Sequence, residues 1–135
     1  MSNLIFPLLT PLIVSLFIAC AASTTESVGL DPGSIREAQV VRVIDGDTLD
    51  VLIAGTRHRV RLFGVNTPER GERCYEAATE RTRHLSGDMV RIESGPRSED
   101  RYGRLLFYLY TLTGESIDAT LIQEGLATAW TLSLL

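Results

Sequence analysis

Four short clusters of polar residues carry the side chains that phosphate chemistry uses. They are 45–48 (Asp-Gly-Asp-Thr), 59–61 (Arg-Val-Arg), 66–69 (Asn-Thr-Pro-Glu) and 100–104 (Asp-Arg-Tyr-Gly-Arg). Hydrolysis of a phosphodiester needs an attacking water, relief of charge on the equatorial oxygens and help for the leaving oxygen. A hard cation held by oxygen ligands supplies part of this, and arginines can clamp the phosphate. Together the clusters therefore contain the groups that such a reaction requires.

Each cluster taken alone has an ordinary interpretation. Asp45-Gly46-Asp47 is typical of a hairpin turn, and Arg61 of a solvated strand position. Glu69 would usually be an exposed loop acid, and the 102–104 segment a turn. Only the combination and order of the clusters favour a functional site.

The elements that must position these clusters begin with three short strands. Alternating or β-branched runs predict strands at 38–44, 48–53 and 57–63, joined by turns at Asp45-Gly46 and Ala54-Gly55-Thr56. A loop with Pro68 follows at 64–73. Further strands are predicted at 89–94 and 105–111, separated by a polar loop at 95–101.

Two helices are predicted among these strands. Cys74, Ala77, Ala78 and Leu85 recur at helical spacing, which predicts an amphipathic helix over 74–85, ending at Ser86-Gly87. A short helix capped by Asp118 is predicted to reach Glu124 before Gly125. Five short strands with a helix after the third favour a closed barrel of the OB type, an α+β fold with a second short helix after the fifth strand.

Four segments, in order, resemble the thermonuclease family, which is also called staphylococcal-nuclease-like, over 40–129. The matching segments are Val-Ile-Asp-Gly-Asp-Thr (43–48), Arg-Leu-Phe-Gly-Val-Asn-Thr-Pro-Glu (61–69), Asp-Arg-Tyr-Gly-Arg (100–104) and Leu-Ile-Gln-Glu-Gly-Leu-Ala (121–127). The resemblance implies an OB barrel with the site on one face. It also implies Ca²⁺-dependent hydrolysis of DNA and RNA to products with 3′-phosphates.

The resemblance also assigns roles by position. It implies Ca²⁺ ligands at Asp47, Asn66 and the Thr67 carbonyl, with Asp45 close by adding negative potential. Glu69 matches the residue proposed to orient or deprotonate the attacking water. The two catalytic arginines of the family match Arg61 and Arg104 here, and its phosphate-contacting tyrosine matches Tyr102.

Two features depart from the family pattern. Asn66 stands where many members have a second metal-binding aspartate, so calcium should bind more weakly because charge count tunes affinity. The family continues past position 130 into another helix, whereas this sequence ends with Thr-Leu-Ser-Leu-Leu at 131–135. The C-terminal helix is therefore expected to be missing, with some loss of buried apolar surface.

The N-terminus indicates export. Residues 1–20 contain an uncharged apolar run over 4–19, interrupted by Pro7 and Pro11, and are interpreted as a signal peptide. Ala19-Cys20 resembles a lipoprotein cleavage site with Cys20 as the lipid acceptor; a plain signal ending near 21–22 and an uncleaved anchor are the alternatives. Residues 21–37 are expected to be a flexible tether and 38–135 the domain. All three alternatives place the domain outside the cytosol.

The net charge and the cysteine content exclude some classes of function. The formal net charge is −4, which argues against a protein that coats DNA through many cationic contacts. There are two cysteines, Cys20 and Cys74; if Cys20 takes lipid, Cys74 is alone and no internal disulfide is expected. Cys74 is interpreted as a half-buried helix residue rather than a nucleophile.

The sequence thus predicts an exported nuclease that acts as a monomer on DNA or RNA, with single strands preferred. Membrane contact is expected only through a lipid anchor or the signal segment. A non-catalytic OB module that binds nucleic acid or a partner protein at the cell envelope is the main alternative. Asn66, the acidic charge balance and the short C-terminus favour that alternative. A defective fragment is a third.

Overall fold

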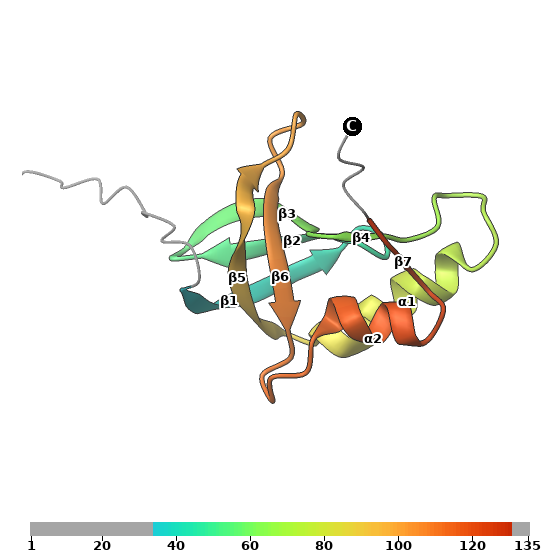
Figure 1. Ribbon diagram of the computed structural model, residues 1–135. Helices are drawn as coiled ribbons and strands as arrows, with labels where there is room; N and C mark the ends of the chain where they lie inside the picture. The colour runs from blue at the N-terminus through green and yellow to red at the C-terminus, as the bar shows by residue number, and fades with distance from the viewer. Residues whose placement is uncertain (1–33, 131–135) are drawn as a thin grey trace, which may run out of the picture.

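A computed structural model describes residues 34–130, which form a five-stranded closed barrel with two helices at one end (Figure 1). The predicted signal peptide with Cys20, most of the predicted tether and the last five residues lie outside the described residues. The elements in chain order are β1 (Ile35–Val43), β2 (Thr48–Ile53), β3 (Thr56–Leu62), β4 (Val65–Asn66), α1 (Tyr75–Ser86), β5 (Met89–Glu99), β6 (Leu105–Tyr110), α2 (Ile117–Gln123) and β7 (Thr128–Ala129). Within residues 34–130, no helix has the length and apolar character needed to cross a membrane.

The barrel closes through one parallel pairing. Strands β1, β2 and β3 form an antiparallel meander, and β5 pairs with both β6 and β1. Strand β3 runs parallel to β6, with Val60 opposite Leu105 and Leu62 opposite Phe107. This arrangement confirms the predicted OB-type α+β barrel.

Alternating side chains fill the barrel interior. On β2, Leu49 and Val51 are fully buried, and on β3 Val60 and Leu62 are fully buried. The residues between them therefore face outward, because successive side chains of a strand point to opposite faces. This alternation places Arg61 on the outer surface of a rigid strand.

Two strands extend beyond their predicted bounds, and two short strands were not predicted. Strand β1 begins at Ile35, three residues before its predicted start. Strand β5 continues to Glu99 through the segment predicted as a polar loop, with an irregular register between Ser94 and Glu99. Pairing with β6 holds this segment extended despite its polar composition. Strands β4 and β7 form a two-residue ladder that is too short to leave a sequence pattern.

Helix α1 begins at Tyr75, and its buried face agrees with the predicted one only in part: Ala78 is buried and Leu85 packs against the core, whereas Ala77 is exposed. The buried residues are Ala78, Thr79, Thr82 and Ser86, so small hydroxyl side chains make the packing surface. Cys74 is exposed and lies in the left-handed region with φ of 68°, so its interpretation as a half-buried helix residue is wrong. The close approach of α1 to the barrel selects these small residues.

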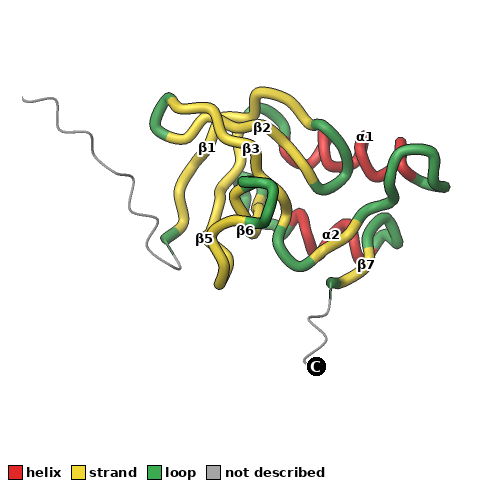
Figure 2. The backbone as a smooth tube through the Cα atoms, turned by 90° about the horizontal axis from the view of Figure 1, so that it is seen from above, coloured by secondary structure: helices red, strands yellow, loops and turns green. Residues whose placement is uncertain are grey.

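Helix α2 is capped by Ser116 rather than by Asp118. The Ser116 side chain accepts a hydrogen bond from the Ala119 amide at 3.1 Å. Asp118 lies inside the first turn, is buried, and accepts a hydrogen bond from the Leu109 amide of β6. Both helices lie at the same end of the barrel in the two perpendicular views (Figures 1 and 2).

Candidate active site

The turn between β1 and β2 presents two carboxylates. The amides of Ile44 and Asp45 donate to the Thr48 carbonyl at 2.9 and 3.2 Å, and the Asp47 amide donates to Asp45 Oδ1 at 3.1 Å. The Asp47 carbonyl in turn accepts from the Leu62 amide at 2.8 Å. This network fixes the backbone of the turn and the position of Asp47 relative to β3.

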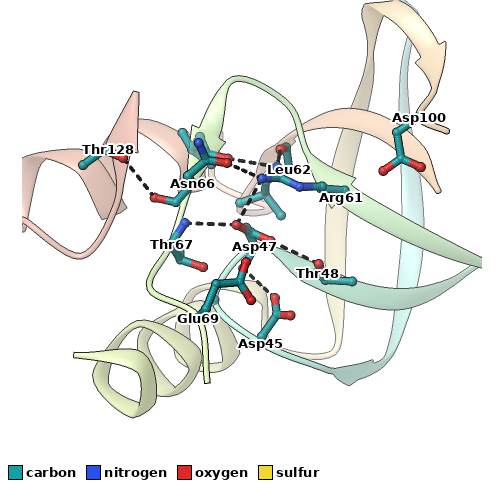
Figure 3. Close-up of polar contacts among 12 residues, drawn as sticks. Asp45, Asp47, Thr48, Arg61, Leu62, Asn66, Thr67, Glu69, Asp100 and Thr128 are labelled. Carbon is teal, nitrogen blue, oxygen red and sulfur yellow. Dashed lines mark hydrogen bonds and ion pairs between the residues drawn. The ribbon is translucent and has the colours of Figure 1, made fainter. Parts of the chain in front are cut away.

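The Asp47 carboxylate is joined to the loop after β4. Its Oδ2 accepts a hydrogen bond from the Thr67 amide at 3.0 Å (Figure 3). A Cβ at Gly46 would lie 2.7 Å from the Thr67 side chain, so only glycine permits this approach. Asp47 and Thr67, which are 20 positions apart in sequence, are therefore neighbours, as their predicted shared role requires.

Helix α1 supports the same turn. Thr82, which is fully buried, donates its hydroxyl to the Gly46 carbonyl at 2.6 Å. A buried carbonyl without this donor would cost free energy. The helix thereby holds the carboxylate turn in place.

Arg61 is held by four acceptors. Its Nη1 donates to the carbonyls of Leu62 and Val65 at 2.7 and 2.9 Å. Its Nη2 donates to Asn66 Oδ1 at 2.5 Å and lies 3.4 Å from Asp47 Oδ2 (Figure 3). The side chain is 17% exposed, so the guanidinium is recessed and fixed beside the Asp47 carboxylate.

Arg104 reaches the same region from the loop between β5 and β6. Asp100 holds it in place: Oδ2 accepts from Arg104 Nε at 2.7 Å, and Oδ1 accepts from its amide at 3.1 Å. Arg104 Nη1 donates to Thr48 Oγ1 at 3.4 Å, and Thr48 donates to Asp47 Oδ1 at 3.1 Å. Thr48 thus connects Arg104 to Asp47, two residues that are far apart in sequence.

A cleft of about 320 Å³ lies between the two arginines. Tyr102, Asp100, Asn66 and Trp130 line it together with Arg61 and Arg104. Tyr102 is 67% exposed, and the Arg104 guanidinium carbon lies 5.5 Å from the centre of its ring. Both predicted phosphate-binding arginines and the predicted nucleotide-contacting tyrosine therefore open onto one cleft.

Glu69 lies beside this cleft rather than within its lining. It lines an adjoining hollow of about 530 Å³ with Thr67, and Asn66 lines both spaces. Glu69 is exposed, and its carboxylate and that of Asp45 point toward one another (Figure 3). Glu69 and Arg104 thus line different spaces, which share Asn66.

Burial and neighbouring charges shift the pKa values of two carboxyl groups near the cleft, those of Asp45 and Asp100. Burial, and then the neighbouring Asp47 carboxylate, raise the pKa of Asp45 above its ordinary value. Burial also acts to raise the pKa of Asp100, but hydrogen bonds from Arg104 and Tyr102 outweigh it, so that this pKa lies below its ordinary value. Asp100 therefore stays ionised as the anchor of Arg104.

The oxygen atoms around Asp47 are of the type that a hard cation such as Ca²⁺ binds. Carboxylates of Asp45 and Asp47, the Asn66 amide and the Thr67 carbonyl are donors that Ca²⁺ accepts. Two observations argue against a strong metal site. Asn66 Oδ1 accepts a hydrogen bond from Arg61. Residues 34–130 also contain no group of three or more Asp, Glu, His or Cys side chains that could hold a metal ion. The oxygen donors are thus of the right type for Ca²⁺, but they carry little negative charge.

Three supporting residues were given no role from the sequence, although two of them, Thr48 and Asp100, lie in the polar clusters. They are Thr48, Thr82 and Asp100, which fix Asp47, the Gly46 carbonyl and Arg104 respectively. The spacing of Asp100 four residues before Arg104 could have indicated its pairing. Thr82 left no such indication, because a hydroxyl on a helix face is ordinary until the packing is known.

Comparison with known proteins gives the family. A family model described as staphylococcal nuclease homologue matches residues 59–133. The chain is 34% identical over 135 residues to a thermonuclease of Staphylococcus hyicus, an alignment that covers 95% of this chain and 79% of the relative.

Two further relatives are matched over a smaller share of their length. A thermonuclease of Staphylococcus intermedius is 42% identical over 97 residues, which is 67% of this chain and 57% of that protein. An endonuclease of Bacillus subtilis (strain 168) is 41% identical over 117 residues, which is 76% of this chain and 54% of that protein. The barrel, the site and these likenesses together show that the chain belongs to the staphylococcal nuclease homologue family.

Proposed function

We propose that this protein hydrolyses phosphodiester bonds of DNA or RNA in a calcium-dependent reaction. Its family, whose relatives include thermonucleases and an endonuclease, makes it a hydrolytic nuclease. The observation that carries the finer proposal is the position of Arg61, whose guanidinium lies 3.4 Å from Asp47 on a cleft shared with Arg104.

The two arginines would bind the scissile phosphate. Each guanidinium has a planar fork of N–H donors that matches two phosphate oxygens. Backbone carbonyls fix Arg61 through Nη1, and Asp100 fixes Arg104 through Nε. Arg61 Nη2, which contacts Asn66 and Asp47, would exchange these acceptors for phosphate oxygens. Donors fixed before the substrate arrives stabilise developing charge without having to reorganise.

Glu69 would orient or deprotonate the attacking water. It is exposed beside Thr67 and points toward the carboxylate turn, so a water in the adjoining hollow is within its reach. Asp47, Asn66 and the Thr67 carbonyl would hold calcium, with Asp45 adding negative potential. Bound there, calcium would supply relief of phosphate charge as a Lewis acid.

Single-stranded or frayed nucleic acid is the proposed substrate. Side-chain exposure is 17% for Arg61 and 26% for Arg104, so both guanidiniums are recessed. A flexible strand can lower one phosphate into such a cleft, whereas the phosphates of an intact duplex lie on a stiff cylinder. The apolar segment that ends at Cys20 supports action outside the cytosol.

A binding module without catalysis is the second candidate. The bond from Arg61 to Asn66 Oδ1 favours it, because the amide oxygen assigned to the metal is occupied. The test is incubation of the purified protein with single-stranded DNA, first with calcium and then with a chelator. Cleavage that needs calcium and is lost in Glu69→Gln and Arg104→Ala supports the enzyme; binding without cleavage in calcium overturns it.

A further inference from the structure

Outside the candidate active site, three arginines surround one buried carboxylate on the outer surface of β1, β2 and β3. Asp50, whose side chain is 3% exposed, accepts from Arg59 Nε at 2.8 Å and Nη2 at 3.2 Å. It also accepts from Arg57 Nη2 at 2.6 Å and Arg42 Nε at 3.2 Å. We call these four residues the Asp50 cluster.

The Asp50 cluster has more positive charge than neutralisation of one carboxylate requires. Three guanidiniums around one carboxylate leave two positive charges in excess. The arginine side chains are 58%, 52% and 47% exposed at positions 42, 57 and 59, whereas the carboxylate is covered by them. Asp50 thus fixes the guanidiniums while their outer edges face solvent. The contact is strong enough to lower the pKa of Asp50 below its ordinary value, chiefly through the hydrogen bonds from Arg59.

The cluster is continuous with the active site along β3. Arg57 and Arg59 lie on the same face of the strand as Arg61, because the intervening Val60 is buried in the barrel. Cross-strand pairing places Arg59 opposite Asp50 and Arg61 opposite Thr48. Residues two apart on a strand are separated by about 7 Å, so the three arginines form a row leading from the cleft toward the turn between β2 and β3.

We infer that this row, with Arg42 beside it, binds the phosphates of a single-stranded nucleic acid that flank the one in the cleft. The inference rests on the proposed nuclease function, since Arg61 is taken as the start of the row. The guanidiniums of Arg42, Arg57 and Arg59 converge on Asp50 Oδ2, so their outer edges form one compact cationic surface beside Arg61, where a flanking phosphate can lie. Half-exposed forks held in place by a carboxylate can contact those phosphates with little loss of side-chain freedom.

The local row also accounts for how an acidic protein can hold a polyanion. The net charge of the chain is −4, so general attraction to nucleic acid is absent. A short line of fixed guanidiniums instead provides a few local contacts, and affinity should then depend on strand length and on salt.

The test compares Arg57→Gln with the wild-type protein by fluorescence anisotropy, using labelled oligothymidylates with a chelator present to prevent cleavage. Arg57 contributes one of several hydrogen bonds to Asp50, so Arg59 and Arg42 still pair with the carboxylate in the variant. Affinity for a long strand should fall severalfold, and the slope of log affinity against log salt should decrease by about 0.7. The loss should be greater for the long strand than for a dinucleotide.

Matched variants show whether the charge at position 57 itself sets the affinity. Arg57→Lys keeps the charge and should restore most of the affinity. Arg83→Gln, which removes an exposed arginine paired with Glu80 on α1, should leave affinity unchanged. Thermal unfolding checks that each variant folds, and Arg42→Gln replaces Arg57→Gln if the latter does not.

The outcomes are distinct from those of the cleavage test. If the wild-type protein cleaves, but Arg57→Gln binds long strands with the same affinity as the wild-type protein, the row is not a binding surface. If polyglutamate competes as well as oligothymidylate, the surface attracts any polyanion and the inference is overturned. Length-dependent binding through Arg57 in a protein that does not cleave would support the row and remove the proposed nuclease function.

Discussion

The Thr82 hydroxyl on α1 donates to the Gly46 carbonyl at 2.6 Å, so that a helix residue fixes the turn that presents Asp45 and Asp47. The two residues are 36 positions apart, and they meet because α1 packs against the barrel. Support of the carboxylate turn is therefore provided by tertiary packing.

Replacing Thr82 by Val should weaken both stability and activity. The side chain keeps its shape but leaves a buried carbonyl without its donor, at a cost of about 1–3 kcal/mol. Urea unfolding would measure the loss of stability, and cleavage of single-stranded DNA at saturating calcium the loss of activity. Thr82→Ser keeps the hydroxyl and should retain the activity that Thr82→Val loses. Equal activity in Val and Ser variants would show that the turn does not need this bond.

Replacing Asp100 by Asn should reduce cleavage about tenfold, equivalent to about 1.4 kcal/mol in the activation barrier. The charged acceptor of Arg104 Nε is weakened, so the guanidinium is less well fixed at the cleft. Steady-state kinetics would measure the effect. Glu80→Gln is the matched control, because it removes an ion pair with Arg83 on the exposed surface of α1. A similar loss in both variants would indicate a general charge effect instead.

Replacing Asn66 by Asp should lower the calcium concentration needed for half-maximal cleavage by about tenfold, since an added carboxylate raises the negative charge of an oxygen site. The new carboxylate would also keep an acceptor for Arg61, so the arginine should stay in place. Calcium titrations of cleavage measure this. Asn66→Ala should move the midpoint in the opposite direction; a midpoint that is the same in all three proteins would exclude Asn66 as a ligand.

Because of Asp118, the free energy of unfolding should decrease as the pH rises from about 4 to about 7. Burial raises its pKa to about 7, and its Oδ1 has no hydrogen-bond partner among the residues described. The folded protein therefore retains a proton that the unfolded chain releases near its ordinary value of 3.8, so stability falls as pH rises through this range and is level above it.

Asp118→Asn removes this titration and should be more stable than the wild-type protein at pH 8 by up to about 4 kcal/mol, and close to it near pH 4. Chemical unfolding across this pH range is the measurement. A constant difference between the two proteins at every pH would contradict a raised pKa at this position. Glu115→Gln, an exposed change just before α2, serves as the control.

The sequence alone determined the barrel and the family resemblance, because strand alternation, glycine turns and four ordered motifs are local properties. The same motifs located Asp47, Arg61 and Arg104, and each strand carries its own information on which side chains face outward. The helix faces were harder to predict, because small hydroxyl residues such as Thr82 have no apolar periodicity. The cap of α2 is Ser116, two residues before the predicted Asp118.

Only the tertiary structure decided which partners these residues have. Barrel closure brings Thr48 of β2 beside Arg104, and the loop after β4 returns Thr67 to Asp47. The gathering of Arg42, Arg57 and Arg59 around Asp50 likewise depends on the register of three strands. Such contacts join residues distant in sequence, and their energies depend on burial and geometry that arise only when the chain folds.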